Sequence, residues 1–105
     1  MELAFRSPAL RTMCEEQEEA VRIIGEKAAS ALQTRLADLR AVTYLADLPA
    51  GRPTVLEVDP PQLQFDLSAG WSLLTTVGGH EVPRTLDGRL DHGRVRRLVI
   101  EEVRQ

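Results

Sequence analysis

Two histidines and two arginines, all in predicted loops, are the residues of this chain best suited to acid–base and phosphate chemistry. Histidine titrates near neutral pH, so His80 and His92 can accept or donate a proton. Arg52 and Arg84 provide fixed positive charges of the kind that bind phosphate oxygens. The four side chains could form a site built from loops. The simpler interpretation, which we favour, is that they are exposed polar residues, because nothing in the sequence fixes their relative positions.

Three other reactive side chains have simpler explanations in packing. Cys14 lies in a stretch with helical spacing and has no neighbouring histidine to activate it, so we assign it to the core. As the single cysteine it excludes an internal disulfide, and we predict neither a metal site nor a cofactor. Tyr44 near the end of a predicted helix is a packing residue. Trp71 could stack on a nucleic-acid base, but a lone tryptophan in an alternating strand belongs more often to the core.

Charge is distributed unevenly along the chain. The formal net charge is −3, which opposes non-specific binding to a polyanion. Residues 53–83 contain four acidic residues and no basic one, which gives −4. Residues 84–105 contain six arginines and four acidic residues, which gives +2. Contacts with an anion therefore belong near the C-terminus, although a solvated loop and strand edge explain so small an excess equally simply.

Length and composition predict one domain spanning 1–105. A chain of 105 residues with 43% hydrophobic residues can form a single core but has little room for a deep pocket. The longest apolar runs are well short of the ~20 residues that cross a bilayer, and the first residues, MELAFRSP, lack a basic region followed by an apolar one. We expect a cytoplasmic protein without a membrane partner.

The first 46 residues are predicted to be mainly helical. A short strand over 2–6 precedes Ser7 and Pro8, a serine cap followed by proline at the first helical position. Helical spacing then continues over 8–46, with a break or bend at Gly25, and predicts two antiparallel helices. The apolar positions that define it are Leu10, Met13, Cys14, Val21 and Ile24 in the first helix, and Ala28, Ala31, Leu32, Leu36 and Leu39 in the second.

Strands are predicted after the Pro- and Gly-containing loop at 45–53. Period-two alternation indicates strands at 54–58, 62–67, 71–77 and 95–103, with a tight turn at 68–70 that makes 62–77 a hairpin. Leu63, Phe65 and Leu73 should face the core. The order of elements predicts an α+β fold in which an antiparallel helix pair packs on one face of a small, mainly antiparallel sheet.

Four stretches resemble the RelE/HigB superfamily, the toxins of bacterial type II toxin–antitoxin modules, and in particular its killer protein, or killer suppression protein, branch. They are MELAFRSPALR at the start, ALQTRLADLRAV in the second helix, FDLSAGWSLLTTV in the hairpin and VPRTLDGRLDHGRVRRLVIEEV at the end. The resemblance extends over nearly the whole chain. It lies in the order of the elements and in the C-terminal pattern, and it implies a RelE-like fold.

The resemblance implies a metal-independent, ribosome-associated mRNA endonuclease, an mRNA interferase. In the family an arginine follows the aromatic residue of the returning strand, and that position is Ser72 in this chain. The stretch VLEVDPPQLQ contains no basic residue, and the chain has EEVRQ where family members often have a Tyr-His ending. Three positions at which the family places catalytic groups therefore differ. We expect the nuclease to be degenerate, with Arg52, Arg84 and His92 as the weak substitutes.

Two function classes follow from this. In the first, the chain is a toxin-like component whose retained property is binding a cognate antitoxin of helix-turn-helix type, with the ribosome or mRNA as a further partner and no small-molecule substrate. In the second, it is a non-enzymatic interaction domain that keeps the RelE-like fold. In the first class, an acidic antitoxin segment should lie against the sheet and helices and meet the C-terminal arginines. An adjacent gene for a small helix-turn-helix protein would favour this first class.

Overall fold

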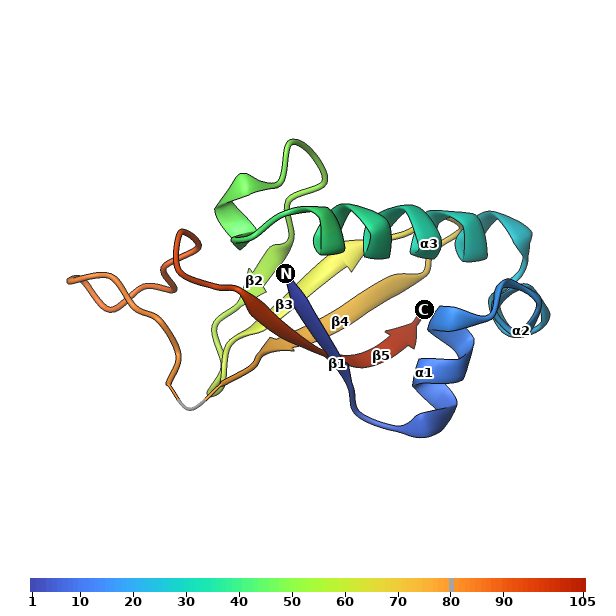
Figure 1. The fold of residues 1–105 in the computed structure, drawn as a ribbon, viewed down its shortest axis with the longest axis horizontal. Coiled ribbons are helices and arrows are strands. Elements are labelled where there is room, and N and C mark those ends of the chain that lie inside the picture. The colour runs from blue at the N-terminus through green and yellow to red at the C-terminus, as the bar shows by residue number, and fades with distance from the viewer. Residues whose placement is uncertain (80) are drawn as a thin grey trace.

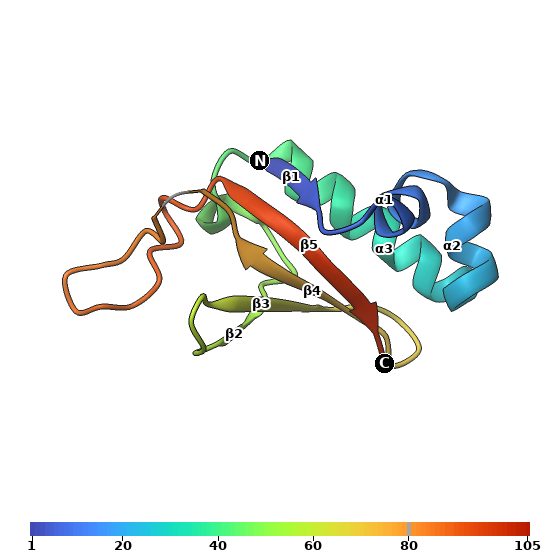
Figure 2. The ribbon, with the colours of Figure 1, turned by 90° about the horizontal axis from the view of Figure 1, so that it is seen from below.

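The computed structural model describes residues 1–79 and 81–105 and has an α+β fold, as predicted (Figure 1). A five-stranded mixed sheet has the order β1-β5-β4-β3-β2. Three helices lie together on one side of this sheet, and its other side has no helix over it (Figure 2). His80, one of the two histidines singled out above, lies outside the described residues.

The N-terminal elements begin as the sequence predicts. Strand β1 is Glu2–Phe5, and helix α1 is Pro8–Glu15. Ser7 caps α1, because its Oγ accepts a hydrogen bond from the Leu10 backbone N–H at 3.2 Å and Pro8 takes the first helical position. Met13 and Cys14 of α1 are buried.

The predicted first helix is wrong in one respect: it is two helices. Glu16 has extended backbone angles and separates α1 from α2, which is Gln17–Ile24. The run EEQEE, 15–19, places like charges three and four positions apart, and this repulsion weakens a continuous helix here. The carbonyl of Cys14, left free at the end of α1, accepts a hydrogen bond from Gln33 Nε2 at 2.8 Å.

This break also changes which side chains are buried. Val21, predicted for the core, is 37% exposed, and Ala20 is buried in its place. Gly25 then separates α2 from α3, Glu26–Ala41, as predicted. Its φ of +85° lies in the left-handed region that favours glycine, so a side chain here would strain the turn between the two helices. The helical layer therefore has three members rather than an antiparallel pair.

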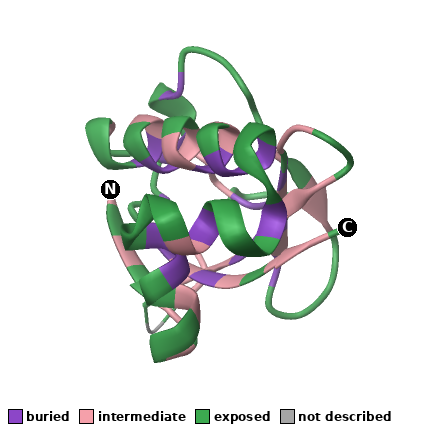
Figure 3. Cartoon of the chain, turned by 90° about the vertical axis from the view of Figure 1, so that its right-hand side faces the viewer, coloured by how far each residue is buried: buried purple, intermediate pink, exposed green. Residues whose placement is uncertain are grey.

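Among the described residues, helix α3 and the hairpin contribute eight of the 18 that form the core. Strand β2 is Thr54–Leu56, β3 is Gln62–Asp66 and β4 is Ser72–Val77, and each lies within a predicted strand. The tight turn at 68–70 is confirmed, with the Trp71 N–H donating to the Ser68 carbonyl at 3.2 Å. Buried residues alternate along β3 and pack with the apolar residues of α3, and Figure 3 shows buried positions on both the helices and the sheet. They include Leu32, Leu36 and Leu39 of α3, Leu63 and Phe65 of β3, and Leu73 of β4.

Strand β5, Arg97–Arg104, lies in the sheet between β4 and β1. It is antiparallel to β4 but parallel to β1, so the sheet is mixed. The pairing of β4 with β5 contains an irregularity between Leu74 and Thr75: Thr75 is opposite Ile100 and Leu74 is opposite Glu102, which leaves Glu101 as an extra residue. Before β5, the chain forms a loop that projects from the rest of the molecule (Figures 1 and 2).

Candidate functional site

The open face of the sheet has Ser72 at the start of β4, where the family resemblance expects an arginine. In the sheet, Ser72 lies directly opposite Asp66 of β3 and Arg104 of β5. Directly opposed residues share a face, so Arg104 extends on the same side of the sheet as Ser72. A cation missing from β4 is therefore present on the neighbouring strand.

Gln64 connects the serine with this arginine. Its Nε2 donates to Ser72 Oγ at 3.5 Å, and its Oε1 accepts from Arg104 Nη2 at 3.4 Å, both near the long limit for a hydrogen bond. Arg104 Nη1 also lies 3.6 Å from Glu102 Oε2. We call these four residues, Gln64, Ser72, Glu102 and Arg104, the Ser72 cluster. Its positive charge is offset by a carboxylate, so the cluster is polar rather than cationic.

A shallow groove of about 410 Å³ lies beside the cluster on the open face. Its charged lining residues are Asp59, Glu101 and Glu102 against Arg6 alone. Glu101 accepts a hydrogen bond from Thr76 Oγ1 at 3.2 Å and lies 3.8 Å from Arg6 Nη1. Three carboxylates against one guanidinium make this groove unfavourable for a phosphodiester backbone.

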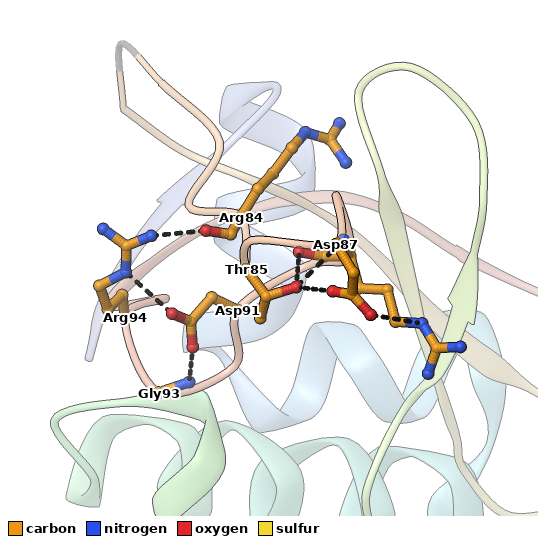
Figure 4. Close-up of polar contacts among 7 residues, drawn as sticks. Arg84, Thr85, Asp87, Asp91, Gly93 and Arg94 are labelled. Carbon is orange, nitrogen blue, oxygen red and sulfur yellow. Dashed lines mark hydrogen bonds and ion pairs between the residues drawn. The ribbon is translucent and has the colours of Figure 1, made fainter.

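The arginines of the projecting loop hold the loop itself together (Figure 4). Arg84 Nη1 donates to the Gly88 carbonyl at 3.0 Å. Arg94 donates through Nη2 to the Arg84 carbonyl at 2.7 Å and through Nε to Asp91 Oδ2 at 2.9 Å. Two of the six arginines in residues 84–105, Arg84 and Arg94, thus donate to groups within this segment.

Carboxylates in the same loop offset the remaining charge. Arg89 Nε lies 3.5 Å from Asp87 Oδ2. The Thr85 hydroxyl donates to Asp87, and this hydrogen bond lowers the pKa of the Asp87 carboxyl below its usual value. Asp87 is therefore ionised at neutral pH and neutralises part of the charge at the loop tip.

The three substitute residues proposed from the sequence are not joined into a site. The His92 carbonyl accepts a hydrogen bond from the Ala46 N–H at 3.0 Å, which attaches that part of the loop to the 3₁₀ helix η1, Leu45–Asp47. Arg52 is exposed after η1, and Arg84 is in the projecting loop. Over residues 1–79 and 81–105, no hydrogen bond or ion pair connects the side chains of Arg52, Arg84 and His92.

The other reactive side chains, Cys14, Trp71 and Tyr44, differ in how far they are buried. Cys14 is fully buried, and burial raises the pKa of its thiol to about 11, so it is protonated and unreactive at neutral pH, as predicted. Trp71 packs partly against the core. Tyr44 is 37% exposed, so the prediction that it is a packing residue is wrong, because the chain has left α3 before reaching it.

In the described part of the chain, no group of three or more His, Cys, Asp or Glu side chains is arranged to hold a metal ion. In those same residues, no helix has both the length and the apolar content needed to span a bilayer.

Comparison with known proteins gives no match: no family model, curated protein or solved structure is significantly similar to this chain. Arg104 is the residue that sequence reasoning missed. It was counted only as one of six C-terminal arginines, and the signal that would have located it is the antiparallel register of β4 and β5, which places it against Ser72.

Proposed function

We propose that this chain is a toxin-like component of a type II toxin–antitoxin module that binds a cognate antitoxin protein and has little or no ribonuclease activity. The observation that supports it best is the sheet with one open face, which agrees with the α+β domain that the sequence resemblance implies. The Ser72 cluster lies on that face, and Ser72 is the position at which the resemblance implies an arginine.

The chemistry of the open face argues against strong cleavage. Attack by a ribose 2′-hydroxyl needs a group that takes its proton, cations that stabilise charge developing on the phosphate, and an acid for the leaving oxygen. Arg104 is the cation nearest to Ser72, and it is paired with Glu102. The adjoining groove has an excess of carboxylates. A missing preorganised donor costs ~10²–10³ in rate, and here more than one is missing.

The test is expression with and without the adjacent reading frame. Co-expression followed by purification at physiological salt should recover a complex with the neighbouring protein. Expression alone should inhibit growth weakly or not at all, and the purified chain should leave messenger RNA intact. Strong growth arrest with RNA cleavage, abolished by changing Arg52, Arg84 or His92, would contradict the proposal and move the site to the loops.

One observation favours the second class, a non-enzymatic interaction domain. Each arginine near the open face is close to a carboxylate: Arg6 to Glu101, Arg97 to Glu2 and Arg104 to Glu102. Such a surface suits a protein partner with mixed charges better than a nucleic acid. Recovery of the chain without any neighbour-encoded partner would favour this class over the first.

A further inference from the structure

The two edges of the sheet differ in how they are protected. Strand β2, at one edge, has only three residues and lies between Pro53 and Pro60, both of which lack a backbone N–H. Strand β1, at the other edge, has no proline and alternates charged or small residues with Leu3 and Phe5. Edge strands without such protection tend to pair with another strand.

Backbone groups on the outer side of β1 are available for such pairing. The N–H groups of Glu2 and Arg6 donate to the Arg96 and Ile100 carbonyls, each at 3.0 Å, so even-numbered residues of β1 pair with β5. Successive residues of a strand direct their N–H and C=O groups to opposite sides, so Leu3 and Phe5 direct theirs outward. A surface groove of about 520 Å³, formed by residues 3–8 and Arg11, lies along this edge.

From this pattern we propose that β1 pairs antiparallel with β1 of a second copy of the chain, with Ala4 on the two-fold axis. In this register Leu3 lies opposite Phe5 of the second copy, so the outward N–H and C=O groups of both residues form hydrogen-bonded pairs. Two such pairs, related by the axis, join the two sheets into one. A shift of the register by two residues in either direction still places outward-directed residues opposite one another. It leaves only one hydrogen-bonded pair within β1, formed by a residue and its own copy across the axis.

The charges on β1 specify the same register. With Ala4 on the axis, Glu2 lies opposite Arg6 of the second copy, and this contact occurs twice. The side chains of Glu2 and Arg6 are both 73% exposed. Among the described residues, the Arg6 side chain forms one ion pair, at 3.8 Å with Glu101, while Glu2 lies 2.9 Å from Arg97. Glu2 would thus lie between two guanidinium groups in the pair, and no like charges would oppose one another across the axis.

A short strand pair of this kind gives a weak, concentration-dependent dimer. Such a dimer does not depend on the proposed function. The test is sedimentation equilibrium of the purified chain up to about 1 mM. Arg6→Glu places two carboxylates opposite one another twice and should weaken the dimer about tenfold or more. The double variant Glu2→Arg with Arg6→Glu restores opposite charges across the axis and should dimerise more tightly than Arg6→Glu alone, although it places like charges near Arg97 and Glu101 within each chain.

Arg89→Glu is the matched control, because Arg89 is also exposed and also lies near a carboxylate, but in the projecting loop. It should leave the dimer unchanged. Amide hydrogen exchange gives an independent measurement: the Leu3 and Phe5 amides should become protected as concentration rises. A monomer throughout the range, a dimer insensitive to Arg6→Glu, or a double variant that dimerises no more tightly than Arg6→Glu alone would overturn the proposal. Binding of an acidic peptide at the β1 edge in place of the second copy would also overturn the proposal.

Discussion

The covered and open faces of the sheet are made from alternate residues of the same strands, and they differ in packing, polarity and reactivity. Under the helices, Leu63, Phe65 and Leu73 are fully buried and interlock with α3. At adjacent positions of the same strands, Gln64 and Ser72 are polar and half-buried. Stability therefore depends on one face, and the other face can vary in chemistry at little cost to the fold.

Truncating the covered face should produce the largest effect. Phe65→Ala and Leu73→Ala should each lower the free energy of unfolding by about 2–5 kcal/mol, because each leaves a cavity in a fully packed core. Their neighbours on the open face provide matched controls: Gln64→Ala and Ser72→Ala should change it by less than about 0.5 kcal/mol. Urea unfolding followed by circular dichroism measures all four. Losses below about 1 kcal/mol at both Phe65 and Leu73 would remove the distinction between the faces.

Raising the pH should affect the buried side through Cys14. The pKa of its thiol is raised from 9.0 to about 11 by burial, so the folded state holds the proton more tightly than the unfolded state does. This contribution to stability is complete below about pH 9 and is lost as the pH rises toward 11. At pH 8 a disulfide reagent should react with the folded chain at least ~10²-fold more slowly than with the urea-unfolded chain. Equal rates would place the thiol at the surface.

Removing one hydroxyl from each face gives a smaller contrast. Thr75 is fully buried, and its Oγ1 donates to the Leu63 carbonyl at 3.1 Å, so Thr75→Val should cost about 1 kcal/mol. Thr76 is next along the chain and donates to Glu101 on the open face. Thr76→Val should cost under about 0.5 kcal/mol, because water can replace the lost partner. Thermal unfolding of the two variants compares them directly, and the reverse order would contradict the assignment of faces.

Changing the Ser72 cluster should have the smallest effect. Ser72→Arg and Arg104→Gln should each alter the free energy of unfolding by less than about 0.5 kcal/mol, since both side chains lie at the surface. Ser72→Arg should also fail to confer RNA cleavage, because the carboxylates of Glu101 and Glu102 remain in the adjoining groove. The assay is incubation of messenger RNA with each variant. Robust cleavage by Ser72→Arg would mean that a single charge is enough to complete a site.

The parts of the structure that the sequence predicts well are those that depend on local signals. Alternation and the turn at 68–70 predict the β3–β4 hairpin, and the Ser7 cap predicts where α1 begins. The break at Glu16 was missed because the apolar spacing continues across it. Arg104 was missed for a different reason. Its position depends on the register of strands distant in sequence and on the extra residue Glu101, neither of which leaves a local pattern.

The position of β5 also bears on how the chain folds during its synthesis. Strand β5 joins β1 to the rest of the sheet, yet Arg97 follows its partner Glu2 by almost the whole described chain. While residues 1–96 emerge from a ribosome, the hairpin can form, but β1 has no strand beside it. The nascent chain therefore leaves Leu3 and Phe5 without their partner strand until translation has passed β5.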